Sequence, residues 1–122
     1  MISTSLQNKE LIGRLTRRLG LKHENHISRI AFSYSIANNG KLDLSEIQDS
    51  KGKTYSKSVF FGDYYNVYIG LVCVKYGLHS SSKDLLKYIK MHVDDGLESL
   101  DELVEEKGLD NSLELVGEVV AG

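Results

Sequence analysis

Apolar residues recur at helical spacing in the first third of the chain. Between Asn8 and Leu19, four large aliphatic residues fall on one helical face, and Gly20 follows at a position typical of a helix end. The pattern of residues 24–37, closed by Asn38-Asn39-Gly40, predicts a second helix. Because the link between them is short, we expect these two helices to pack against each other.

The middle of the chain changes from polar to apolar. Residues 41–62 are rich in Ser, Asp, Lys and Gly, which predicts an ordered loop with extended pieces. The expected anchors of this loop are Leu42, Leu44 and Ile47.

Nearly every position from Asp63 to Tyr76 is apolar or aromatic. This pattern predicts a central helix, capped by Asp63 and ended by Gly77, because fourteen residues are long for the alternative, a buried strand. Gly70 is expected to mark a close helix contact.

The last third carries an apolar stripe that steps by three and four residues from Leu86 to Val104. It predicts a helix that begins after Ser80-Ser81-Ser82, and the pattern leaves open whether one helix continues through Gly96 or two meet there. Beyond Asp110 a short amphipathic helix and a frayed end are both compatible with the sequence. The predicted fold is mainly α: a compact bundle of about four to five helices with a ribbon-helix-helix-like start and one long ordered loop.

Composition agrees with one helical domain. The chain has 122 residues, no proline and one cysteine, Cys73, which is expected to be a buried, inert thiol in a reducing cytoplasm. No stretch resembles a secretion signal or reaches the ~20 apolar residues of a membrane span. We therefore expect a cytoplasmic protein that needs no membrane, metal or cofactor.

Charge is distributed unevenly along the chain. Residues 1–90 hold 14 Lys and Arg against 7 Asp and Glu, whereas residues 91–122 hold 1 against 10. A basic body suggests a polyanion partner, because Lys and Arg that neutralise phosphates release counterions from nucleic acid. Two solvated helix faces of opposite sign are the alternative.

The candidate DNA-contacting cations form three groups: the first helix and the link after it, the polar loop, and the early outer face of the last predicted helix. They are Arg14, Arg17, Arg18, Lys22, Lys51, Lys53, Lys57, Lys83, Lys87 and Lys90. Tyr55 lies between two loop lysines, where it could stack on an exposed base or pin the loop.

No catalytic constellation is recognisable. The sequence lacks a glycine-rich phosphate loop, clustered cysteines and a nucleophile elbow. His23 and His26 could share a metal but have no third ligand at useful spacing, and the adjacent Asp94 and Asp95 would point apart on a helix. We expect a protein that is not an enzyme.

The loop and the segments after it carry a resemblance. Leu42-Asp43-Leu44-Ser45-Glu46-Ile47, Gly52-Lys53-Thr54-Tyr55-Ser56-Lys57, Phe61-Gly62-Asp63-Tyr64-Tyr65 and His92-Val93-Asp94-Asp95-Gly96, in that order, resemble the DNA sulfur modification family DndE. With the initial helix pair, the resemblance covers about residues 5–104.

This resemblance implies an accessory protein of DNA phosphorothioation. Such a protein binds duplex DNA, with a preference for nicked duplex, through surface lysines that include Lys53 and Lys57 here. It assembles as a homotetramer and works with other proteins of the sulfur modification system, which carry out the sulfur chemistry. The family's cation near Gly96 is replaced by Asp94 or Asp95, so a DNA contact there is in doubt.

Two other classes remain open. A strand at residues 3–6 before two helices resembles a ribbon-helix-helix repressor, although that strand has no Lys or Arg to read bases. A protein interaction module whose basic and acidic parts pair between subunits would bind no DNA.

The expected organisation is a DndE-like helical domain over residues 1–104 and an acidic C-terminal extension over 105–122. We expect this extension to screen the basic surface rather than to form the fold.

Overall fold

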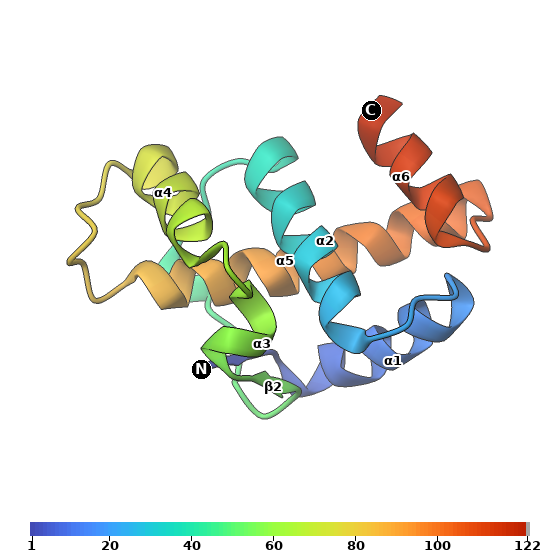
Figure 1. Cartoon of the computed structure of the whole chain (residues 1–122), viewed down its shortest axis with the longest axis horizontal. Coiled ribbons are helices and arrows are strands. Elements are labelled where there is room, and N and C mark those ends of the chain that lie inside the picture. The colour runs from blue at the N-terminus through green and yellow to red at the C-terminus, as the bar shows by residue number, and fades with distance from the viewer. Residues whose placement is uncertain (122) are drawn as a thin grey trace.

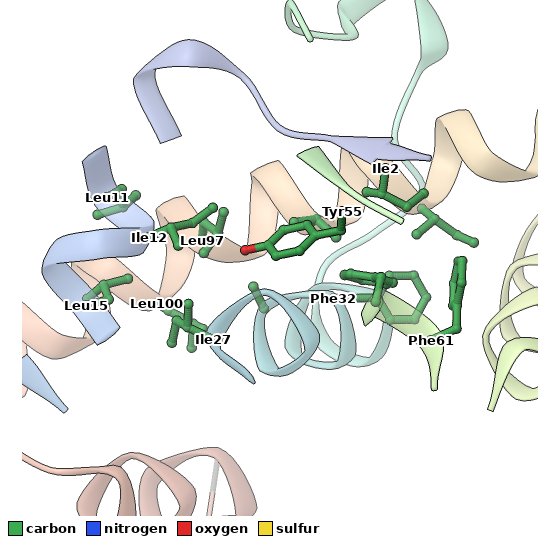
Figure 2. Packing of buried hydrophobic residues seen from close by; sticks show 14 of the residues in the cluster. Ile2, Leu11, Ile12, Leu15, Ile27, Phe32, Tyr55, Phe61, Leu97 and Leu100 are labelled. Atoms are coloured by element: carbon green, nitrogen blue, oxygen red, sulfur yellow. The ribbon is translucent and has the colours of Figure 1, made fainter. Parts of the chain in front are cut away.

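The fold is built around one long helix. The computed structural model describes residues 1–121, and in it α5 (Leu85–Lys107) runs along the molecule while α1 (Leu6–Arg18), α2 (Glu24–Asn38) and α4 (Tyr65–Tyr76) pack against it (Figure 1). The expectation of a mainly helical bundle is confirmed, with six α-helices in the described residues. Ile12, Phe32 and Leu97 belong to one core cluster to which α1, α2 and α5 contribute, and Figure 2 shows them spread along that core.

The chain begins with a short strand that pairs within the same molecule. β1 (Ile2–Ser3) runs antiparallel to β2 (Thr54–Tyr55), with Ile2 opposite Tyr55. The side chains of Ile2 and Tyr55 are both buried in the core. A ribbon-helix-helix unit would instead pair this strand with its copy in a second chain and present it to the major groove. A strand followed by two helices at the start of the chain is confirmed, but its pairing with β2 argues against the alternative of a ribbon-helix-helix repressor.

The polar loop is ordered, as expected. It contains a 3₁₀ turn (η1, Leu44–Glu46), β2 and the short helix α3 (Lys57–Phe61), which the sequence did not reveal. Two backbone bonds to Thr4 hold it: the Thr4 amide donates to the Lys53 carbonyl, and the Gly52 amide donates to the Thr4 carbonyl, each at 2.9 Å. The predicted anchor Ile47 is 38% exposed, so this prediction is wrong for Ile47.

The predicted central helix lies at one end of the molecule. α4 begins at Tyr65 rather than after Asp63 and ends at Gly77, whose φ of 64° gives the predicted left-handed stop. Only Ile69 and Val72 of this helix are buried. The prediction of a helix in this segment is confirmed, but its predicted central position is wrong, because the helix that contacts α1, α2 and α4 is α5. No atom lies within 4 Å of a Cβ added at Gly70, so the expected close contact there is also wrong.

α5 passes through Gly96 without a break, which answers the question that the sequence left open. The buried stripe continues through Val93, Leu97, Leu100 and Val104, all fully buried. The predicted apolar stripe is thus confirmed as core.

The C-terminal segment packs on the body. α5 continues to Lys107, past the predicted boundary after Val104, and α6 (Ser112–Ala121) follows. Leu109 and Leu115 lie in the core, and the Ser112 amide donates to the Leu19 carbonyl at 2.9 Å. The expectation that residues after Val104 stay outside the fold is wrong for these residues. The division into a domain and an extension remains a prediction.

Candidate nucleic-acid interface

The α1 cations face the acidic half of α5. Arg14 bonds to the Asp101 carboxylate at 2.9 Å, and Arg18 bonds to Glu105 at 2.8 Å and lies 3.6 Å from Asp110. The Arg18 Nε also donates to the Leu109 carbonyl at 2.9 Å. α5 and the segment after it therefore place carboxylates where a DNA phosphate would lie.

A shallow groove of about 1080 Å³ lies between α1 and α5. Lys9, Arg14 and Arg17 line one wall, and four acidic residues (Glu10, Glu98, Asp101 and Glu102) contribute to the lining. Burial, followed by the neighbouring acidic groups, raises the pKa of Glu98, which accepts a hydrogen bond from Gln48. This mixed lining does not select for a phosphate backbone, because its carboxylates would repel it.

The second cationic area is formed by the polar loop and the start of α2. A pocket of about 420 Å³ brings Lys22 and Lys53 together, although they are thirty-one positions apart in the sequence. Its other lining includes the hydroxyls of Thr54 and Ser56 and the amide of Asn25, side chains that can donate hydrogen bonds to an anion. Sequence reasoning missed these polar residues, because contacts between residues far apart in sequence, such as Tyr55 with Glu24 and Ser28, bring the loop to α2.

Lys57 begins α3 beside this pocket. Its Nζ lies 5.3 Å from the ring centroid of Tyr65, and Lys53 Nζ lies 5.9 Å from that of Tyr55 and 3.7 Å from the Glu24 carboxylate. We name Lys22, Lys53 and Lys57 the loop face. Glu24 is the one acidic residue in the lining of its pocket.

Tyr55 pins the loop and cannot stack on a base. Its side chain is 3% exposed, and its hydroxyl donates to the Glu24 carbonyl at 3.2 Å while lying 2.9 Å from the Ser28 hydroxyl. Burial raises its pKa to about 12. Of the two roles considered for Tyr55, base stacking is wrong and loop anchoring is confirmed.

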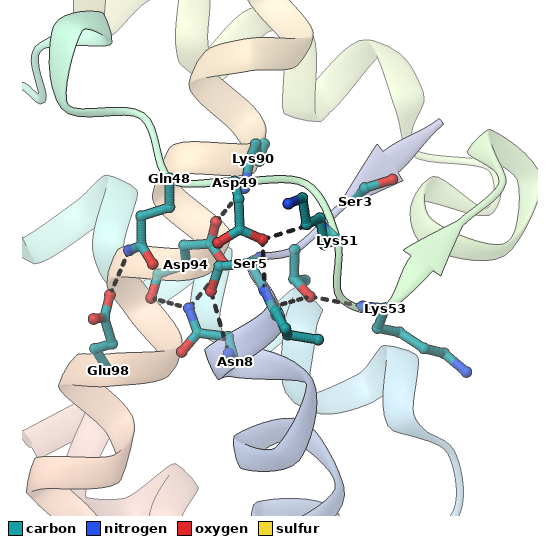
Figure 3. Close-up of polar contacts among 12 residues, drawn as sticks. Ser3, Ser5, Asn8, Gln48, Asp49, Lys51, Lys53, Lys90, Asp94 and Glu98 are labelled. Atoms are coloured by element: carbon teal, nitrogen blue, oxygen red, sulfur yellow. Dashed lines mark hydrogen bonds and ion pairs between the residues drawn. The ribbon is translucent and has the colours of Figure 1, made fainter.

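Lys90 is buried and is not available to DNA. It bonds to the Asp94 carboxylate, whose other oxygen accepts hydrogen bonds from the Ser5 amide at 3.0 Å and the Asn8 side chain at 2.8 Å (Figure 3). A buried charge of this kind is stable only with its partner in place. The expectation that Lys90 contacts phosphate is therefore wrong, and Asp94 is the residue that joins the chain's start to α5.

The remaining candidate cations are dispersed. Lys83 lies before α5 begins, so it does not share a helical face with Lys87, which lies 3.6 Å from Asp84. The expectation that Lys83, Lys87 and Lys90 lie on one face of the same helix is therefore wrong for Lys83. Within residues 1–121, Arg17, Lys22, Lys51, Lys57 and Lys83 form no ion pair.

His92 lies in a buried polar chain. The Leu42 amide donates to the Tyr76 hydroxyl at 2.8 Å, and that hydroxyl lies 2.7 Å from His92 Nε2. The Nδ1 of His92 lies 2.7 Å from the Ser35 oxygen, whose hydroxyl donates to Asp95 at 2.7 Å. The network therefore assigns a neutral ring protonated on Nδ1. Burial lowers the pKa of His92 to about 4.

These residue types do not form a catalytic triad. In a triad the acid orients the histidine and the serine lies at the other ring nitrogen, whereas here Ser35 bridges His92 and Asp95. Both Ser35 and His92 are completely buried, so no substrate reaches them. The chain of bonds ties the loop to α2, α4 and α5.

The other candidate chemical groups, His23, His26 and Cys73, do not form a metal site in the described residues. His23 and His26 lie with ring centroids 5.4 Å apart, edge to face, and no described group of three or more His, Cys, Asp or Glu residues could hold a metal ion. Cys73 is a free thiol and is partly exposed, so the prediction of a buried thiol is wrong. Over the described residues, no helix is both long and apolar enough to span a membrane.

Comparison with known proteins identifies the family. The crystal structure of DndE from Escherichia coli B7A, described as involved in DNA phosphorothioation modification, superposes with a TM-score of 0.65 at 21% identity, covering 81% of this chain and 94% of that one. A DndE variant with two glycine-to-lysine substitutions superposes with a TM-score of 0.65 at 20% identity, covering 80% and 93%. No curated protein matches. The family model for the DNA sulphur modification protein DndE matches residues 1–107, and the chain belongs to this family.

Proposed function

We propose that this chain is an accessory, non-catalytic component of DNA phosphorothioation that binds duplex DNA. The observation that carries the proposal is the family match over residues 1–107, supported by the fold shared with DndE. The other proteins of the sulfur modification system are its proposed partners, and they carry out the sulfur transfer. We place its action in the cytoplasm.

The loop face is the proposed principal DNA contact. Lys22 and Lys53 line a pocket together with hydroxyl and amide groups, and Lys57 lies beside Ser58 in a neighbouring pocket. A phosphate backbone is bound by the same combination of cations and neutral donors. Two fixed backbone bonds to Thr4 hold the loop in shape, so little conformational entropy is lost on binding. The proposed secondary contacts are Lys51, Arg17, Lys83 and Lys87. Arg14 and Arg18 can bind a phosphate only after releasing the carboxylates with which they pair.

Preference for nicked duplex follows from deformability. A nick removes the stacking restraint of one strand, so bending the DNA toward several cationic areas costs less free energy than bending intact duplex. Self-association, with a homotetramer as the proposed state, multiplies the cationic areas that one DNA molecule can touch.

The salt dependence of DNA affinity tests the loop face. Each phosphate contact contributes about −0.9 to the slope of log affinity against log salt on duplex DNA. We expect Lys53→Ala/Lys57→Ala to flatten this slope by about two, and Lys107→Ala, an exposed lysine at the end of α5, to leave it unchanged. An unchanged slope in the double variant removes the loop face from the interface.

A gel-shift comparison of nicked and intact duplex tests the substrate preference. We expect tighter binding to the nicked duplex, and equal affinity would contradict the deformability argument. Absence of any DNA binding, together with subunit association that weakens steeply with salt, would favour the protein interaction module instead.

A further inference from the structure

The pocket of the loop face combines cations and neutral donors from separate segments of the chain. It has a volume of about 420 Å³, and its lining includes Lys22 and His23 before α2, Asn25 at the start of α2, and residues 53–56. Lys22 is exposed, and the His23 side chain makes no capping hydrogen bond to α2, so both can approach a ligand. Figure 3 shows the Lys53 side chain pointing away from the polar contacts at the start of the chain.

The neutral groups of this pocket are held in place by their own contacts. The Asn25 Nδ2 donates to the Val59 carbonyl at 3.2 Å, which uses one of its two N–H groups and leaves the other for a ligand. The Ser56 oxygen caps α3 by accepting a hydrogen bond from the Val59 amide at 3.3 Å. Thr54 lies in β2, where its hydroxyl oxygen is 2.9 Å from that of Ser3. The pocket therefore presents polar groups in fixed positions from both α2 and the loop.

The charges of the lining suit a group with more than one negative charge. Lys53 lies 3.7 Å from the Glu24 carboxylate, with both side chains more than a third exposed, and Lys22 forms no ion pair within residues 1–121. An internal DNA phosphate carries one negative charge, and sugars flank it on both sides. A terminal phosphate carries about −1.5 to −2 at pH 7 and has three free oxygens, so it gains more from two ammonium groups and several hydrogen-bond donors.

We infer that this pocket receives the terminal phosphate group of a DNA strand, as a nick exposes it. The inference rests on the proposed function and names the part of the nicked duplex that the loop face recognises. Lys57 lines the neighbouring pocket, so it contacts the continuing backbone rather than the strand end. Deformability favours every nick over intact duplex, whereas the pocket distinguishes nicks by the chemistry of their ends.

Binding to nicked duplexes of one sequence tests this site. Three forms differ only at the nick: one has a 5′-phosphate, one has a 3′-phosphate, and one has hydroxyls at both ends. By gel shift at fixed salt, we expect the preferred phosphate form to bind about fivefold more tightly than the hydroxyl form, which is the gain expected from one further exposed ion pair. Comparison of the two phosphate forms shows which strand end enters the pocket.

Three variants separate the pocket from the rest of the loop face. Lys22→Ala should remove most of the advantage of the phosphate form, whereas Lys57→Ala should weaken binding of both forms equally and leave their ratio unchanged. Glu24→Gln removes the one carboxylate of the lining, so we expect it to increase the advantage of the phosphate form. All three positions are at least partly exposed, and circular dichroism checks that the variants fold.

The outcomes separate this site from the proposed function. Equal affinity for all three forms, or a phosphate advantage that survives Lys22→Ala, overturns the pocket as a site for a strand end while DNA binding stands. An equal loss of the advantage in Lys57→Ala also overturns it, because that result would indicate a general charge effect. The absence of binding to every duplex contradicts both the inference and the proposed function.

Discussion

Gly96 of α5 lies against the backbone of Ala31 in α2, so closely that a Cβ on Gly96 would come 1.9 Å from the Ala31 carbonyl oxygen. Both residues are buried, and the obstructing atom belongs to a helix backbone that cannot turn aside. The close approach of α2 and α5 therefore depends on the missing side chain.

We expect Gly96→Ala to destabilise the fold by roughly 2–4 kcal/mol, although alanine favours a helix interior by about 1 kcal/mol, because overpacking forces the two helices apart. Urea denaturation followed by circular dichroism measures the change. Gly70→Ala is the matched control in α4, where the added Cβ meets no atom within 4 Å. We expect it to be neutral or stabilising by up to about 1 kcal/mol, and equal losses in both variants would contradict the packing argument.

Stability should fall in mild acid because of His92. Its pKa is about 4 in the folded chain, against 6.5 for an unperturbed histidine, so the unfolded chain binds a proton first as pH falls. The contribution of the neutral ring is fully present above about pH 6.5 and is lost progressively toward pH 4, amounting to about 3 kcal/mol. Denaturation midpoints measured from pH 8 to pH 4 give this dependence.

His92→Gln removes the titrating group from the buried chain. We expect it to lower stability at pH 7 and to reduce the pH dependence between pH 6.5 and pH 4, whereas His79→Gln, at an exposed histidine, should keep the original profile. An undiminished acid dependence in His92→Gln would assign the effect to other groups.

Neutralising the partners of Arg18 should strengthen DNA binding. Glu105→Gln/Asp110→Asn removes both carboxylates that pair with Arg18, leaving the guanidinium available to phosphate. Exposed pairs are worth about 0–1 kcal/mol, so we expect affinity to rise up to about fivefold and the salt slope to steepen by about 0.9. Gel shifts at several salt concentrations measure both quantities.

The paired control is Glu106→Gln/Glu114→Gln, which makes the same change in charge at exposed acids that form no ion pair in the described residues. A similar gain in this control would indicate a general charge effect. Removing all residues after Val104 is a less specific test, because it also deletes Leu109 and Leu115 from the core.

Local periodicity was sufficient for α1, α2 and the buried stripe of α5, since each depends on residues close together in sequence. It predicted the helix α4 but not its place at one end of the molecule, because an apolar helix indicates that a partner surface is needed and does not show whether that surface belongs to the same chain. The burial of Lys90 and Tyr55 also could not be predicted from local periodicity. Each depends on the N-terminal segment, which meets Asp94 and the loop across large separations in sequence.

The two bonds between Thr4 and the loop also set the order of events during synthesis. β1 is translated before residues 54–55 and cannot form its strand pair until they have been made. The Ser5 amide cannot form its hydrogen bond until Asp94, eighty-nine positions later, has been made. At about 5–20 residues per second, the loop lysines therefore leave the ribosome several seconds before the last element that fixes them is made. A nascent chain that has not yet reached Asp94 would carry these cations on a segment held by fewer bonds, because the contact of Asp94 with the Ser5 amide is still missing.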